Sequence, residues 1–272
     1  MAKFLIDKST YEINLKGKFY FGPDKVLSTK ETDPCYDQEW YSQGYKISNL
    51  FSESEFNLLY KGINNCICKF SKKNKFPLEK YHEYIKDDQT HMEIVKKTRD
   101  LFPEDFNFDV KKIIRKLELL MGFPLTDIDP DTNKKLHIIV RINRPFSNDY
   151  NPPHKDIYQQ YDETGIIPKC INFWIPICGV TFQSMLPLAK SSHLLPENKI
   201  YRTKDGGIIE KNKYRVRSVL HWDGSNKLSR PKIKDGQVLI FSSHLIHGCA
   251  INEQKYITRV ALEFRLFKGK EQ

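Results

Sequence analysis

The sequence predicts an α+β fold, in which helices from the first part of the chain cover one side of a β-sandwich or jelly roll formed by the second part. Two observations predict it. Between residues 52 and 121, apolar side chains recur at the three- and four-residue spacing of amphipathic helices. From about Leu136 the apolar period shortens to two, and glycine-containing turns separate the β-like runs.

The first part of the chain is expected to be mainly helical. Residues 1–46 alternate only loosely and suggest short strands or extended chain. Ser52-Glu53-Ser54-Glu55 has the pattern of a capping box and predicts the start of an amphipathic helix that continues to about Phe70. Further helix is expected around 78–100, and a third helix over 107–121, which Gly122 would end.

The second part contains five runs with strand-like alternation, at Leu136–Asn143, Cys170–Gly179, Tyr214–Trp222, Gln237–Ser242 and Tyr256–Phe267. We therefore expect a single domain over residues 1–272, with a helix-rich part at 1–130 and a jelly-roll core at 131–268.

Composition favours a folded, cytoplasmic protein. Hydrophobic residues make up 39% of the 272 positions, no apolar run is long enough to span a membrane, and the N-terminus lacks the apolar run of a signal peptide. The six cysteines include no CxxC pair, so we expect free, mostly buried thiols.

Positive charge is concentrated in one segment. The formal net charge is +10, and the stretch from 196 to 235 holds 11 Lys/Arg against 5 Asp/Glu, a surplus of 6. We expect this segment to be a loop-rich basic insert near the mouth of a pocket, although a solvated basic surface would have the same composition.

Three residues have side chains of the types that bind a metal ion. His154 and Asp156 are two positions apart in a segment preceded by Asn151-Pro152-Pro153, so in extended chain they point to the same side. His247 follows an apolar strand and precedes Gly248, which would allow close backbone approach; His244 is the rival ligand. Two imidazoles and one carboxylate bind one face of an octahedral metal and suit non-haem Fe(II).

Polar residues on neighbouring strands indicate a lined cavity. In the last strand Arg259, Ala261, Glu263 and Arg265 share one face, opposite Val260, Leu262, Phe264 and Leu266. If the aliphatic face packs on helices, Arg259 faces the cavity, where a buried guanidinium needs an anion; an Arg–Glu pair with Glu263 is expected for Arg265. On the inward faces of two other strands we place two pairs of residues, Arg141 with Asn143 and Asn172 with Trp174.

These motifs resemble the phytanoyl-CoA hydroxylase and ectoine hydroxylase group of Fe(II)/2-oxoglutarate oxygenases, over roughly Leu136 to Phe267. The resemblance is carried by Arg141-Ile142-Asn143 before the His-x-Asp pair, by Phe173-Trp174-Ile175-Pro176, by the segment from Gln183 to His193, and by Asp235-Gly236 through His247-Gly248 and Thr258-Arg259. Ser184 and Lys190-Ser191 depart from the glycine and the Pro-Gly of the group's pattern.

The resemblance implies a double-stranded β-helix that holds Fe(II) on His154, Asp156 and His247. It also implies 2-oxoglutarate on that metal, with its distal carboxylate on Arg259 and further cofactor contacts from Asn143 and Asn172. With O₂ as the other cosubstrate, such an enzyme hydroxylates an unactivated C–H and releases succinate and CO₂.

The substrate is expected to be a polar or anionic small molecule of the sugar, acyl or glycolipid type, with Arg141, Trp174 and Tyr158 as its contacts. Two alternatives remain open. One is an AlkB-like nucleic-acid demethylase, which Arg259 and Arg265, six residues apart, also fit. The other is a non-catalytic jelly-roll metal-binding protein. The oligomeric state is not determined by the sequence.

Overall fold

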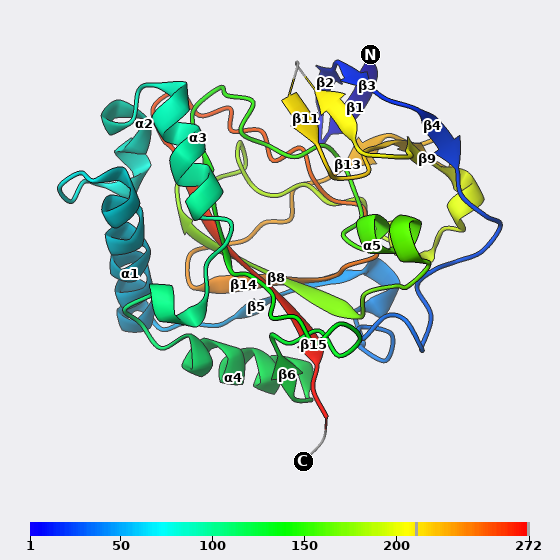
Figure 1. The fold of residues 1–272 in the computed structure, drawn as a ribbon, viewed down its shortest axis with the longest axis horizontal. Helices are drawn as coiled ribbons and strands as arrows, with labels where there is room; N and C mark the ends of the chain where they lie inside the picture. The colour runs from blue at the N-terminus through cyan, green and yellow to red at the C-terminus, as the bar shows by residue number, and fades with distance from the viewer. Residues whose placement is uncertain (210–211, 271–272) are drawn as a thin grey trace.

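The computed structural model describes residues 1–209 and 212–270. Its helices lie mainly in the first part of the chain and border a central antiparallel sheet (Figure 1). The helices are α1 Glu53–Ser71, α2 Tyr81–Tyr84, α3 Asp88–Lys97, α4 Val110–Met121 and α5 Tyr158–Thr164. No helix in the described ranges combines the length and apolar character that a membrane crossing needs.

The predicted helix boundaries follow from local capping. Ser52 caps α1: its hydroxyl accepts from the Glu55 amide and the Glu55 carboxylate accepts from the Ser52 amide, which completes the predicted capping box. Asp109 caps α4, which ends at Gly122 in the left-handed conformation. The expected helix at 78–100 is divided into α2 and α3, and Asp87 caps the second of these.

The central sheet has six antiparallel strands that curl into a half-barrel (Figure 1). Strands pair in the order β5-β14-β8-β15-β6, and β7 also pairs with β15. Their bounds are β5 Tyr45–Asn49, β6 Leu125–Thr126, β7 Ile139–Asn143, β8 Cys170–Cys178, β14 Gln237–Ser242 and β15 Arg259–Lys268. Strands β8 and β14 agree closely with the predicted runs, whereas β7 and β15 begin three residues later than predicted.

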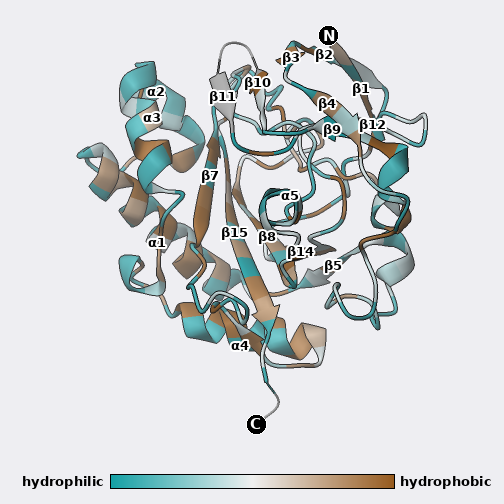
Figure 2. Cartoon of the chain, turned by 45° about the vertical axis from the view of Figure 1, so that its right-hand side comes forward, coloured by the Kyte–Doolittle hydropathy of each residue, from teal (hydrophilic) through white to brown (hydrophobic). Residues whose placement is uncertain are grey.

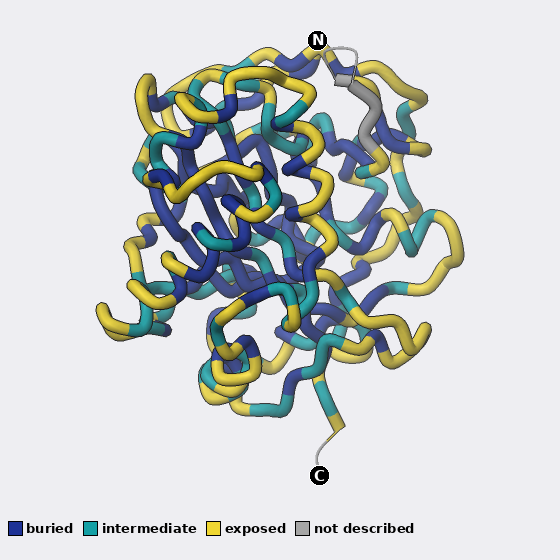
Figure 3. The backbone as a smooth tube through the Cα atoms, turned by 60° about the vertical axis from the view of Figure 1, so that its left-hand side comes forward, coloured by how far each residue is buried: buried dark blue, intermediate teal, exposed yellow. Residues whose placement is uncertain are grey.

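The helices cover the aliphatic face of this sheet. The faces predicted for the last strand are confirmed, because Val260, Leu262, Phe264 and Leu266 of β15 pack in one buried cluster with residues of α1 and α4. Figure 2 shows hydrophobic and hydrophilic bands alternating along both helices, and Figure 3 shows the buried backbone gathered in the interior. The opposite face of β15 is therefore left for a cavity.

The basic segment is more ordered than predicted. Instead of a loop-rich insert it contains short strands, which pair with N-terminal strands into three small sheets; Glu210 and Lys211 lie outside the described residues. The pairs are β1 with β2 and β13, β3 with β10, β10 with β11, β4 with β9, and β9 with β12. Their bounds are β1 Ala2–Ile6, β2 Ser9–Ile13, β3 Leu15–Lys16, β4 Phe19–Phe21, β9 Ile200–Thr203, β10 Gly207–Ile209, β11 Asn212–Tyr214, β12 Val219–Trp222 and β13 Lys227–Leu228.

All six cysteines are free and buried, as predicted. The predicted strand 214–222 is interrupted, because its first residue ends β11 and only its last four form β12.

Candidate active site

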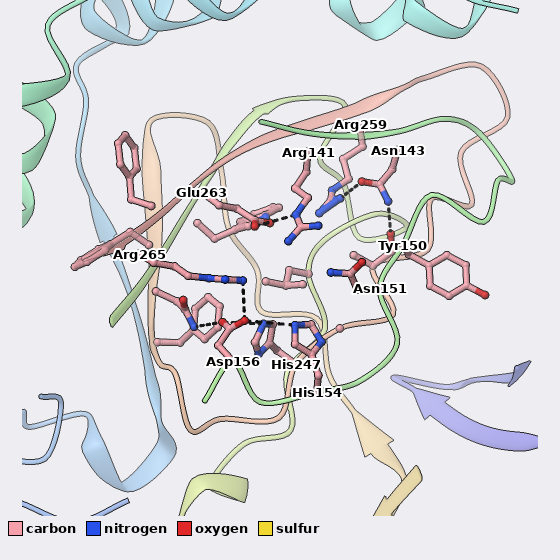
Figure 4. Close-up of a pocket in the computed structure, with 18 of the residues that line it drawn as sticks. Arg141, Asn143, Tyr150, Asn151, His154, Asp156, His247, Arg259, Glu263 and Arg265 are labelled. Carbon is pink, nitrogen blue, oxygen red and sulfur yellow. Dashed lines mark hydrogen bonds and ion pairs between the residues drawn. The ribbon is translucent and has the colours of Figure 1, made fainter. Parts of the chain in front are cut away.

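The predicted trio of metal ligands is assembled in the structure. One potential ligand atom from each of His154, Asp156 and His247 lies within 4.8 Å of the others. The Nε2 atom of His154 is 3.6 Å from Oδ1 of Asp156, and the Nε2 atom of His247 is 3.5 Å from Oδ2 (Figure 4). It is the one such group in residues 1–209 and 212–270.

The backbone brings the two histidines together. The His154 amide donates to the His247 carbonyl at 2.8 Å, and the His247 amide donates back at 3.0 Å. Gly248 has φ +136°, and a Cβ there would lie 2.4 Å from the Pro152 carbonyl oxygen. The glycine expected to allow close approach therefore does so.

Backbone carbonyls orient both imidazoles. Nδ1 of His154 lies 2.7 Å from the Pro152 oxygen, and Nδ1 of His247 lies 3.0 Å from the Leu245 oxygen. When each Nδ1–H donates to its carbonyl, each Nε2 presents a lone pair to the centre of the trio. Burial, aided by neighbouring His154, lowers the pKa of His247 to about 4, so it is neutral at neutral pH.

His244, the rival ligand, does not belong to the trio. Its Nε2 instead lies 3.3 Å from the backbone oxygen of Thr32.

Two side chains hold the Asp156 carboxylate, one on each oxygen. Asn172 donates from Nδ2 to Oδ2 at 2.7 Å, and Arg265 places Nη2 2.7 Å from Oδ1. Burial alone would raise the pKa of Asp156, but Arg265 and the two imidazoles hold it well below its usual value. Asn172 thus orients a candidate ligand, whereas we expected it to contact the cofactor directly.

The expected partner of Arg265 was wrong. Glu263 accepts a hydrogen bond from Nε of Arg141 at 2.9 Å, and Arg265 pairs with Asp156 instead. Sequence reasoning missed the role of Arg265, although its position on the same face of β15 as Arg259 indicated that it faces the cavity.

Arg259 provides a buried cation in the same cavity. It lies directly opposite Asn143 in the β15–β7 pairing, and its Nη1 donates to the Asn143 Oδ1. The guanidinium carbon lies 5.2 Å from the Trp174 ring, and Nε has no hydrogen-bond partner among the described residues. Burial lowers the pKa of Arg259 to about 10, which leaves it charged at neutral pH and suited to an incoming carboxylate.

One cavity connects the trio with this arginine. Its lining includes Arg141, Asn143, His154, Asp156, Asn172, Trp174, His247, Arg259, Glu263 and Arg265 (Figure 4). Trp174 is buried, and its indole Nε1 has no partner in the described structure. The predicted inward faces of β7, β8 and β15 thus meet around one space.

Tyr158 lies elsewhere, contrary to its expected role as a substrate contact. Its side chain is buried in a hydrophobic cluster with Ile200 and Ile246, and its hydroxyl donates to Oε2 of Glu197 at 2.7 Å. The expectation assumed that extended chain continues past Asp156, but the backbone turns at Ile157 and enters α5. The turn directs Tyr158 away from the cavity.

Part of the positive charge of the basic segment is neutralised by ion pairs. Arg202 pairs with Glu197 and Asp162, and Arg217 places Nη2 3.1 Å from Glu163. Arg217 belongs to the segment that we expected near the pocket mouth, but its side chain is buried against α5, where it pairs with Glu163.

Comparison with known proteins identifies the fold. No protein-family model and no curated protein sequence matches the chain. EctD from S. alaskensis, crystallised with 2-oxoglutarate and 5-hydroxyectoine, aligns with a TM-score of 0.51 at 13% identity, over 95% of this chain and 86% of that chain. The non-heme alpha ketoglutarate dependent epimerase SnoN from nogalamycin biosynthesis aligns with a TM-score of 0.44 at 11% identity, over 84% and 79%. The first alignment is close enough to establish a common architecture, so this chain has the fold of EctD.

Proposed function

We propose that the chain is a non-haem Fe(II)/2-oxoglutarate-dependent dioxygenase, with its 1–272 residues forming one domain around a jelly-roll core. The observation that carries this proposal is a single cavity that contains both the His154, Asp156 and His247 trio and the buried cation of Arg259. The fold of EctD supports it.

The trio fits a divalent iron ion. It offers two imidazole nitrogens and one ionised carboxylate from one side, and this donor set leaves other coordination positions open for cosubstrates. Hydrogen bonds to Asp156 and to both Nδ1 atoms fix the ligand orientations before a metal binds.

Arg259 and its neighbours fit the distal carboxylate of 2-oxoglutarate. A buried, charged guanidinium requires an anion, and its open Nε is such a donor. Asn143 fixes the guanidinium from the opposite strand, and Trp174 packs on it.

Bound Fe(II), together with 2-oxoglutarate and O₂, supplies the oxidising chemistry that hydroxylates an unactivated C–H with release of succinate and CO₂. The protein contributes position and shielding. Asn172 and Arg265 hold the carboxylate of Asp156, and Trp174 and Phe241 give the cavity apolar walls that exclude water.

The substrate is a polar or anionic small molecule of the sugar, acyl or glycolipid type. Arg141 supports this assignment, because only its Nε is used by Glu263 and its terminal nitrogens point into the cavity (Figure 4). Trp174 supplies a flat apolar surface beside it. The nucleic-acid alternative is less favoured, because three arginines of the basic segment, Arg202, Arg217 and Arg230, already pair with carboxylates of the protein.

Formation of succinate from 2-oxoglutarate tests the proposal and separates it from the non-catalytic alternative. We expect purified protein with Fe(II) and O₂ to release succinate slowly without substrate, and His247→Ala to abolish the release. His221→Ala, on β12, is the matched control and should retain it. Iron-loaded, folded protein that releases no more succinate than His247→Ala would contradict the enzymatic assignment.

A further inference from the structure

A second, larger cleft opens next to the candidate active site. Its volume is about 810 Å³. It is lined by residues of α3 and β7, by the loop that follows β7, and by Arg215, Val216 and Arg265. Five of these residues, Arg141, Asp149, Tyr150, Asn151 and Arg265, also line the cavity with the metal trio. The two spaces therefore adjoin each other across these shared residues.

The cleft carries an excess of positive charge. Five of its described lining residues are arginines and two are aspartates. Arg141 and Arg265 also pair with Glu263 and Asp156 in the adjoining cavity, so the balance with these partners is 5 − 4 = +1. Both aspartates form ion pairs with Arg144, whose guanidinium lies 2.8 Å from Asp88 and 2.9 Å from Asp149. Exposed Arg215 and the terminal nitrogens of Arg141, whose Nε donates to Glu263, remain to receive an anion.

Large apolar side chains are exposed in the same cleft. Met92 on α3 is 60% exposed, and Phe146 is 67% exposed. Val95, Ile139 and Val216 add further apolar surface. Exposed apolar side chains that gather in one cleft mark a binding surface, whereas scattered ones need no explanation.

The backbone holds Phe146 in its exposed position. Phe146 has φ +48°, a left-handed conformation that is unfavourable for an aromatic residue. The turn persists because the Phe146 amide donates to the Asn252 oxygen at 2.9 Å and the Arg144 amide donates to Asp149 at 3.0 Å. Strained backbone of this kind clusters at active sites and ligand-binding sites.

We infer that this cleft binds the substrate, and that the substrate is amphipathic. It has a carboxylate or phosphate, which the arginines bind, joined to an apolar segment that packs on Met92 and Phe146. This inference rests on the proposed function for the chemistry, but the binding itself does not require turnover.

Calorimetric titration of the full chain, loaded anaerobically with Fe(II) and 2-oxoglutarate, tests the inference with four probes: octyl phosphate, octanoate, octan-1-ol and inorganic phosphate. At least one of the two amphipathic anions should bind about tenfold more tightly than octanol and inorganic phosphate do, which corresponds to about 1.4 kcal/mol. Comparison of octyl phosphate with octanoate identifies the anionic group.

Variants in the two walls should have different effects. Arg215→Gln should weaken binding of the preferred amphipathic anion about tenfold, or about 1.4 kcal/mol, without affecting octanol. Phe146→Ser should weaken the same probe and octanol, without affecting inorganic phosphate. Lys111→Gln and Leu119→Ser are the matched controls, because both residues are exposed on α4.

Each outcome has a distinct meaning. If the iron and 2-oxoglutarate bind but neither amphipathic anion binds more tightly than its separate parts, the cleft inference is overturned and the proposed function stands. If the controls weaken binding as much as the cleft variants do, the inference is also overturned. If iron and 2-oxoglutarate do not bind, the proposed function fails, while probe binding that Arg215→Gln weakens would still support an amphipathic-anion site.

Discussion

His154 and His247 exchange two backbone hydrogen bonds, each amide donating to the other residue's carbonyl, at 2.8 and 3.0 Å. A pair of residues bridged in this way presents both side chains on the same side of the local sheet. The ring centroids accordingly lie 4.3 Å apart. The separation of the two candidate ligands is therefore set by main-chain pairing between segments far apart in the sequence.

Gly248→Ala should disrupt this pairing. The added Cβ would lie 2.4 Å from the Pro152 oxygen and 2.9 Å from the Pro153 Cα, at φ +136°. We expect metal affinity to fall sharply and the free energy of unfolding to drop by more than the roughly 1–3 kcal/mol of backbone strain alone. Calorimetric metal titration and urea unfolding measure the two effects. Gly122→Ala, at φ +77° with nothing within 4 Å of its Cβ, controls for strain without a clash; equal losses in both variants would contradict the explanation.

Asn172→Ala should weaken metal binding without unfolding the protein. The Asn172 amide fixes one oxygen of Asp156, and loss of such a supporting hydrogen bond typically lowers metal affinity about 10- to 100-fold. Competition with a fluorescent chelator measures the dissociation constant. The control is Asn74→Ala, at an exposed position after α1. Unchanged affinity in Asn172→Ala would mean that Asp156 is not a ligand or that Arg265 alone orients it.

Glu197→Gln should destabilise the fold beneath the metal site. Glu197 is fully buried and accepts hydrogen bonds from Lys155 at 2.8 Å, from Tyr158 and from Arg202. Loss of its charge leaves buried Lys155 uncompensated and removes one carboxylate partner of Arg202, which keeps Asp162. We expect the free energy of unfolding to fall by about 3–5 kcal/mol.

Urea unfolding at neutral pH checks this value. Asp223→Asn removes an exposed partner of Lys199 and should change stability by less than about 1 kcal/mol. Because Lys155 lies between His154 and Asp156, we also expect weaker metal binding in Glu197→Gln. Similar small losses in both variants would show that the buried network is not a major source of stability.

Stability should decrease as the pH falls below about 6.5. Burial lowers the pKa of His193 from 6.5 to about 4, so between these values the unfolded chain takes up a proton that the folded chain does not. The contribution of His193 to the free energy of unfolding is complete above pH 6.5 and is lost at about 1.4 kcal/mol per pH unit on acidification. His244 and His247 act in the same direction.

The metal-free protein and His193→Gln are compared by urea unfolding between pH 7.5 and 4.5. Near pH 5 the free energy of unfolding should depend less steeply on pH in the variant, by the equivalent of about one proton. Above pH 7 the variant and the wild type should have the same slope. An unchanged slope near pH 5 would contradict a neutral, buried His193.

Local patterns predicted much of the fold. The capping box and helical period at 52–70 gave α1, and the alternation of the last strand identified which face of β15 lines the cavity. The same alternation placed Asn172 and Trp174 inward on β8. Such periodic signals report the direction of side chains within one element. The metal trio was predicted separately, from the spacing of His154 and Asp156 and from the position of His247 after an apolar strand.

Contacts between distant elements were not predictable in the same way. The pairing of β1 with β13 joins the N-terminal strand to the basic segment, and no local pattern specifies it. Arg265 was expected to pair with Glu263, but the tertiary arrangement places it on Asp156 and places Arg141 on Glu263. The prediction for Tyr158 was wrong because α5 begins at Tyr158, where we had assumed that extended chain continues.

The most direct test of the central claim is anaerobic addition of Fe(II) and 2-oxoglutarate to the protein, followed by visible absorption spectroscopy. We predict a metal-to-ligand charge-transfer band in the wild type that is retained in the control Arg115→Ala, exposed on α4. The band should weaken in Arg259→Ala and disappear in Asp156→Ala. A folded, iron-loaded wild type that gives no band, or a band unchanged in both active-site variants, would contradict the assignment of this cavity as an Fe(II)/2-oxoglutarate site.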